Sequence, residues 1–132
     1  METRIMEGFK NQKLLVLPEE TVNNISAHPL LRNLYITDIG YFPHARNHYI
    51  ERKEGCEQNI LIYCIKGEGY VIVNNKKYRI CCNDLLIIPK NLPHIYGSSE
   101  EDPWYIYWFH YKGKRTAFLF RTAAPLRSLR CL

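Results

Sequence analysis

The sequence predicts an all-β domain of short antiparallel strands, arranged as a sandwich or a barrel. Runs rich in β-branched and aromatic residues recur at intervals of roughly ten residues, and Gly, Pro, Asn and Asp separate them. The chain has 132 residues, of which 46% are hydrophobic. That length is enough for one domain with a core and too short for two.

The strand-like pattern begins at residue 33. The run at residues 59–65 is apolar on both faces, which predicts a central strand buried on both sides. Asn74 and Asn75 tolerate the positive φ of a two-residue hairpin and are predicted to join two strands. The predicted strands are residues 34–37, 49–50, 59–65, 70–73, 77–80, 85–88 and 104–111.

The N-terminal part is less regular. Residues 13–17 read as a short apolar strand or arm that Pro18 ends. Residues 19–32 carry polar clusters and Pro29, which predict a loop with at most one helical turn. The expected organisation is an N-terminal arm and loop at 1–32, a barrel at 33–112 and an irregular basic tail, the start of a linker, at 113–132.

Charge and cysteine usage exclude several classes. The net charge is +5, but residues 1–111 carry a net −1 and the last 21 residues a net +6, so no phosphate-binding face is expected on the folded body. No segment resembles a signal peptide or a membrane span, which indicates a cytoplasmic protein without membrane contact. The five Cys form an odd set without CxxC pairs, so neither a disulfide framework nor a zinc ribbon is predicted.

Two motifs carry a family resemblance. Residues 54–69 (EGCEQNILIYCIKGEG) and 83–94 (NDLLIIPKNLPH) resemble the two cupin motifs as they occur in sensor domains of AraC-type transcription regulators. Residues 104–111 extend the likeness through the strand that closes such barrels. The resemblance implies a cupin double-stranded β-helix, a jelly-roll barrel. Asn83 stands where the family usually has Gly, and Asn can adopt the same left-handed backbone.

Many cupins are metalloenzymes, and the resemblance places their ligand positions on Glu54, Cys56, Ile60 and His94. Only His94 matches its expected type, and Ile60 cannot ligate a metal. No Ser or Cys lies in a recognisable nucleophile motif. We therefore predict no metal, no cofactor and no catalytic residue, and keep a metal-dependent isomerase or dioxygenase as the alternative.

The resemblance also implies a ligand pocket. Arg52 occupies the position at which sugar-binding members carry an Arg that hydrogen-bonds ligand hydroxyls, and an exposed surface Arg is the alternative. Trp108 is implied to face inward and stack on a sugar ring, unless it only fills the barrel. Tyr96 matches a further pocket position. Ile106 replaces a polar His of the arabinose-binding relative, which argues against arabinose itself.

Three histidines complete the candidate set. His94 is expected at the barrel mouth, either in contact with the ligand or hydrogen-bonded at the rim. His44 and His48 precede Arg52 and line the mouth in one interpretation, while exposed loop positions are the other.

Together these observations favour an effector-binding and dimerisation domain of a bacterial AraC-type regulator. Its expected partners are a small-molecule effector, most simply a carbohydrate, and a second copy in a weak homodimer. DNA would be contacted only through a helix-turn-helix domain that this sequence does not contain. A barrel that serves only for dimerisation is the third interpretation.

Overall fold

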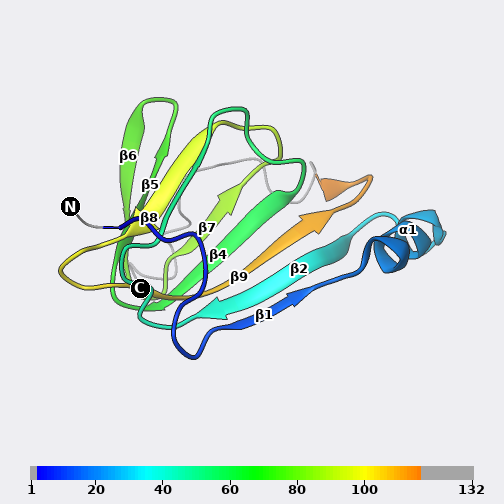
Figure 1. Ribbon diagram of the computed structural model, residues 1–132. Coiled ribbons are helices and arrows are strands. Elements are labelled where there is room, and N and C mark those ends of the chain that lie inside the picture. Colours follow the sequence, from blue (N-terminus) through cyan, green and yellow to red (C-terminus); the bar gives the residue numbers. More distant parts are fainter. Residues whose placement is uncertain (1–2, 117–132) are drawn as a thin grey trace.

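A computed structural model describes residues 3–116 of the chain, and Figure 1 traces their strands and helix. The described part is mostly β-strand, with a single helix of nine residues. The elements are β1 (Lys13–Val16), α1 (Glu19–Ala27), β2 (Tyr35–Phe42), β3 (Tyr49–Arg52), β4 (Asn59–Lys66), β5 (Gly69–Val73), β6 (Lys76–Ile80), β7 (Leu85–Ile88), β8 (His94–Ser98) and β9 (Tyr105–Lys112).

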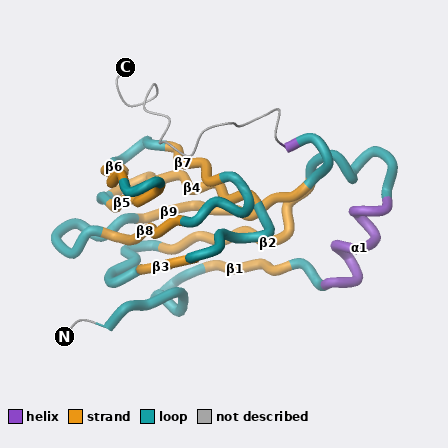
Figure 2. The backbone as a smooth tube through the Cα atoms, turned by 90° about the horizontal axis from the view of Figure 1, so that it is seen from above, coloured by secondary structure: helices purple, strands orange, loops and turns teal. Residues whose placement is uncertain are grey.

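The strands form two antiparallel sheets that face each other, as Figure 2 shows from above. The larger sheet has the order β1-β2-β9-β4-β7, and the smaller has the order β3-β8-β5-β6. β9 lies between β2 and β4 although the three are far apart in sequence, and β8 likewise lies between β3 and β5. This crossing pattern is that of a jelly-roll barrel, so the all-β prediction is confirmed.

The core fills the space between the sheets. Along β4 the buried side chains of Ile60, Ile62 and Cys64 point inward. Leu61 and Tyr63 between them are only partly buried, so the prediction of a strand buried on both faces is wrong. The physical reason is that a sheet of a two-sheet sandwich offers only one face to the shared core.

The predicted turns are confirmed. Asn74 and Asn75 have φ of 51° and 62°, and they join β5 to β6 with Val73 opposite Lys76. Asn83 has φ of 71°, the left-handed conformation that the motif requires. Of the two alternatives for residues 13–17, a short strand or an arm, the structure shows the strand, β1.

Helix α1 corrects the prediction of a loop with at most one helical turn at residues 19–32. It runs for nine residues, and the acidic Glu19 and Glu20 in its first turn stabilise the positive end of the helix dipole. It buries none of its side chains, so no apolar stripe in the sequence could reveal it. The helix ends at Ala27, two residues before Pro29.

The predicted basic tail falls mostly on residues 117–132, outside the described residues. Between residues 3 and 116, no helix has both the length and the apolar character needed to cross a membrane.

Candidate functional site

A cavity of about 290 Å³ lies inside the barrel and is walled by both sheets. Five candidate residues line it: His48 just before β3, Arg52 of β3, Tyr96 of β8, and Ile106 and Trp108 of β9. Met6 and Glu7 of the N-terminal arm, with Leu14 and Val16 of β1, also reach it. Strand alternation places these side chains on the inner face, so the cavity gathers residues that are remote in sequence.

Arg52 is held in place by two neighbours on β8. Its backbone pairs with that of His94, and its Nη1 lies 3.0 Å from His94 Nε2. The same nitrogen donates to the Tyr96 hydroxyl at 3.4 Å. The rings of His94 and Tyr96 are stacked with centroids 5.8 Å apart and planes at 6°. The guanidinium therefore has a fixed position at the cavity wall.

His94 contacts the Arg52 guanidinium and does not line the cavity itself. Burial lowers the pKa of His94, and the positive charge of Arg52 lowers it further. A neutral ring fits the hydrogen bonds: Nε2 accepts from Arg52 and Nδ1–H donates to the Leu92 carbonyl at 2.7 Å. This tautomer is assigned from the hydrogen-bond partners. Both ring nitrogens of His94 are thus engaged.

Trp108 and Ile106 form the apolar wall from β9. Ile106 is fully buried, and the Trp108 ring lies 5.4 Å from the ring of Phe42. Trp108 packs directly over Gly40 of β2, where an added Cβ would lie 2.5 Å from Cζ2 of the indole. The indole Nε1 is buried and has no hydrogen-bond partner within residues 3–116.

His44 lies elsewhere. It is an exposed loop residue with φ of 41°, its ring 5.8 Å from that of Tyr105, and it does not line the cavity. For His48 the alternative of an exposed loop position is wrong, because the side chain is only 3% exposed and lines the cavity. Burial, aided by the charge of Arg52, lowers the pKa of His48 to about 3, so this ring is neutral.

The cavity also contains a polar pair that the sequence did not single out. Asp38 Oδ2 lies 3.0 Å from His110 Nδ1, and the Asp38 carboxylate also accepts from the Thr37 hydroxyl at 2.7 Å. Burial works to raise the pKa of Asp38, but hydrogen bonds with His110 and Thr37 outweigh it and hold the pKa below its usual value. Asp38 lies on β2 and His110 on β9, and the antiparallel pairing of these two strands places the two residues opposite each other.

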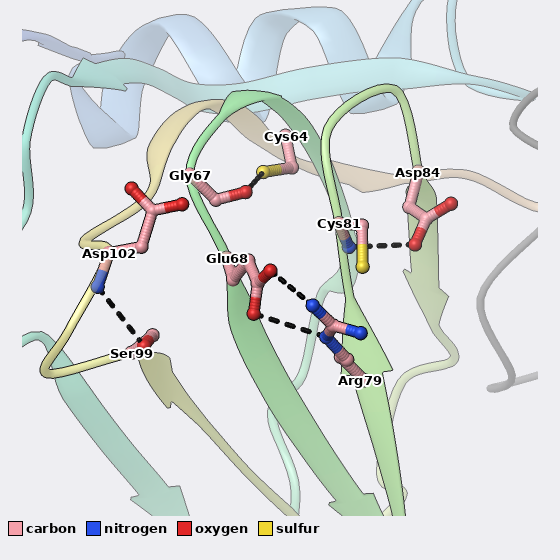
Figure 3. A network of polar contacts seen from close by, with 8 residues as sticks. All are labelled: Cys64, Gly67, Glu68, Arg79, Cys81, Asp84, Ser99 and Asp102. Atoms are coloured by element: carbon pink, nitrogen blue, oxygen red, sulfur yellow. Dashed lines mark hydrogen bonds and ion pairs between the residues drawn. The ribbon is translucent and has the colours of Figure 1, made fainter.

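A separate polar network lies around the turn between β4 and β5, and Figure 3 shows it. Arg79 of β6 binds both carboxylate oxygens of Glu68, with Nε to Oε2 at 3.1 Å. Asp84 Oδ2 accepts from the Cys81 backbone N–H at 2.7 Å. The Glu68–Arg79 contact joins the turn before β5 to β6, and the Asp84–Cys81 contact closes the loop between β6 and β7, so both have a structural role.

The residues at the cupin metal positions do not form a ligand set. Ile60 is a core residue with 1% exposure, and the Cys56 thiol donates to Gln58 Oε1 at 2.8 Å. Across the described range 3–116, no group of three or more His, Cys, Asp and Glu side chains is arranged to hold a metal ion. Burial raises the pKa of Cys64 to about 12, so this thiol is a poor nucleophile.

The fold and the cavity define a ligand-binding β-barrel domain. The chain belongs to the family of AraC-like ligand binding domains, whose family model matches residues 38–131. It is 34% identical over 121 residues to the MmsAB operon regulatory protein of Pseudomonas aeruginosa, covering 86% of this chain and 39% of that protein. The chain thus spans about two fifths of the length of this relative.

Solved structures confirm the cupin fold. The Cnp3 cupin domain of Schizosaccharomyces pombe matches with a TM-score of 0.51 at 13% identity, over 83% of this chain and 71% of that one. The plu4264 protein of Photorhabdus luminescens matches with a TM-score of 0.50 at 16% identity, over 89% of this chain and 88% of that one. At these identities the likeness concerns the fold alone.

Proposed function

We propose that the chain is the effector-binding domain of an AraC-type transcription regulator and that its effector is a small hydroxylated molecule of the carbohydrate type. The observation that carries this proposal is that Arg52 and Trp108 line the same cavity. Membership of the AraC-like ligand binding family and the similarity to an operon regulatory protein support it.

The cavity offers the chemistry that such a ligand needs. Arg52 presents hydrogen-bond donors from a fixed position, and the Asp38 carboxylate supplies acceptor oxygens. The Trp108 ring and Ile106 provide apolar surface for the carbon skeleton of the ligand. A few convergent polar groups on a mostly apolar wall are typical of small-molecule sites.

Regulation would follow from contacts beyond the barrel. A ligand in the cavity would also touch Met6 and Glu7 of the N-terminal arm, which line it. We propose that ligand binding biases the placement of DNA-binding segments, with a second copy of the chain as a weak dimer partner. DNA would not be read by residues 3–116, whose one helix is short and polar.

An enzyme is the weaker candidate for this cavity. A metal cupin needs His94 as a ligand, but both of its ring nitrogens are already hydrogen-bonded to Arg52 and Leu92. Ile60 at a ligand position offers no donor atom.

The test is a ligand screen of the 132-residue protein by thermal shift, followed by calorimetry with every compound that raises the melting temperature. Arg52→Ala and Trp108→Ala are each expected to weaken binding by about 2–3 kcal/mol. Arg46→Ala, at an exposed position, is the control and should bind as wild type does. If both cavity variants bound the compound like wild type, the proposed site would be wrong.

A further inference from the structure

No carboxylate among residues 3–116 forms an ion pair with Arg52. In the described part of the chain, Arg79 forms an ion pair with Glu68 and Lys112 forms one with Glu57, while His110 contacts Asp38, and none of these pairs includes Arg52. Its two hydrogen bonds go to the neutral His94 ring and the Tyr96 hydroxyl, and both come from Nη1. The Nε and Nη2 donors of Arg52 make no hydrogen bond to residues 3–116.

The contrast with Arg79 is informative. Arg79 lies on the surface with 64% of its side chain exposed, and it still holds a carboxylate in the fork of its guanidinium. Arg52 is more buried and lines the cavity, so it has less water around it to solvate its charge. A half-buried guanidinium with unused donors favours an anionic partner.

The carboxylates near the cavity do not fill this role. Asp38 lines the same cavity and interacts electrostatically with Arg52, but the two side chains make no ion pair or hydrogen bond, and the Asp38 carboxylate is engaged by His110 and Thr37. Glu7, the other acid that lines the cavity, is exposed on the N-terminal arm and lies beyond ion-pair distance from Arg52. Within residues 3–116, therefore, no carboxylate satisfies the Nε and Nη2 donors of Arg52, whereas a molecule that enters the cavity can do so.

A second unused donor, the indole N–H of Trp108, also favours a ligand that carries oxygen atoms. The Nε1–H of Trp108 is buried on the cavity wall and has no acceptor within the described residues. Leaving such a donor unsatisfied is costly, so an oxygen of a bound ligand is its natural acceptor. The cavity thus presents unused N–H donors from two strands, together with one engaged carboxylate that can still accept from a hydroxyl.

We propose that the effector is a small hydroxylated carboxylate, whose carboxylate group binds Arg52 and whose oxygens also satisfy the Trp108 N–H. This inference rests on the proposed function and narrows its ligand from neutral carbohydrates to hydroxy acids or sugar acids. The cavity volume of about 290 Å³ limits the ligand to a small molecule. The space equals that of about ten water molecules at roughly 30 Å³ each.

The experiment compares acids with their neutral counterparts by calorimetry on the 132-residue protein. The probes are glycerate against glycerol and gluconate against sorbitol, so that charge differs while the hydroxylated chain is kept. At least one acid is expected to bind with a Kd lower than that of its neutral counterpart by on the order of 10- to 100-fold. The short and long pairs distinguish a hydroxy acid from a sugar acid.

Three variants separate the role of the charge from folding. Arg52→Met is expected to abolish the preference for the acid, whereas Arg52→Lys retains part of it because the cation remains. Trp108→Phe removes the N–H while keeping a ring, and is expected to weaken binding of the acid as well. The exposed Arg46→Met is the matched control and should keep the full preference. Thermal melting of each variant confirms that it is folded.

Equal or tighter binding of a neutral probe by wild type would overturn the carboxylate inference while leaving the proposed function in place. The inference also fails if the acid is preferred equally by wild type and Arg52→Met. If neither acid binds at millimolar concentration, the carboxylate inference is overturned. Compounds from the ligand screen that bind Arg52→Ala and Trp108→Ala as tightly as wild type would instead contradict the proposed function.

Discussion

The indole Nε1–H of Trp104 donates a hydrogen bond to Nδ1 of His48 at 3.1 Å, and both side chains are buried. This bond ties the start of the last strand to the loop before β3, next to the ligand cavity. Trp104 is fully buried and is packed against Gly69, where an added Cβ would lie 2.1 Å from Cε3 of the indole.

We expect Trp104→Phe to destabilise the protein by about 1–3 kcal/mol, since it removes the donor and leaves the buried His48 nitrogen without a partner. Trp108→Phe is the matched control, because the N–H it removes has no acceptor within residues 3–116. Urea denaturation should therefore show a smaller loss for Trp108→Phe. Equal losses would mean that the His48 hydrogen bond adds nothing to stability.

His48 also predicts how stability depends on pH. Its folded pKa of about 3 lies below the ordinary histidine value of 6.5, so between these two pH values the unfolded chain binds a proton and the folded chain does not. The free energy of unfolding should thus fall as pH drops through this window, by up to about 1.4 kcal/mol per pH unit for one such group. Burial also lowers the pKa of His94, so His94 adds to the same loss of stability at low pH.

The measurement is urea denaturation of wild type and His48→Gln over this pH range, with NMR titration of the His48 ring as the direct check. Gln offers Trp104 an acceptor but does not titrate, so the variant should show a shallower decline. A His48 ring that becomes protonated near its ordinary pKa would contradict the buried, neutral assignment.

Gly40 is expected to be required for the shape of the cavity. Its position opposite Trp108 in the sheet leaves no room for a side chain, since the added Cβ would lie 2.5 Å from the indole. Gly40→Ala should displace the Trp108 ring, raise the ligand Kd, and destabilise the protein by about 1–3 kcal/mol. Ile39→Ala, on the opposite face of the same strand and 39% exposed, should leave the Kd unchanged.

The Asp38–His110 pair is expected to show energetic coupling. The two side chains are only 16% and 12% exposed, so water screens their interaction little. In a double-mutant cycle with Asp38→Asn and His110→Gln, the coupling energy from urea denaturation should be about 0.5–3 kcal/mol. Additive losses would show that the contact of 3.0 Å contributes no net stability.

The sequence predicted those parts of the site that depend on local pattern. The family resemblance identified Ile106 and Trp108 as pocket positions, and both line the cavity. Asp38 was missed because an Asp inside a strand looks like a turn residue. Only the pairing of β2 with β9 brings Asp38 to His110, and that contact between distant segments leaves no mark in the local pattern.

The same reasoning applies to the fold. The hairpin of β5 and β6 was predictable because its turn chemistry is local, with two Asn residues at positive φ. Helix α1 was missed because all its side chains are at least partly exposed and it carries no core-facing stripe. The outer face of β4 was assigned as buried because apolar residues such as Leu61 stand there, although the structure leaves them partly exposed.

The β5–β6 turn offers a prediction of increased stability. Asn74 and Asn75 both have positive φ, the requirement of a type I′ turn, for which Asn-Gly is the preferred pair. Asn75→Gly should remove the residual cost of a side chain at φ 62° and raise the free energy of unfolding by about 0.5–1 kcal/mol. Asn75→Ala should lower it by roughly 1 kcal/mol, because Ala tolerates this conformation less well than Asn. Urea denaturation of the three proteins should therefore rank Gly above Asn and Asn above Ala. The reverse order for Gly and Asn would mean that the Asn75 side chain stabilises the turn by more than its backbone strain costs.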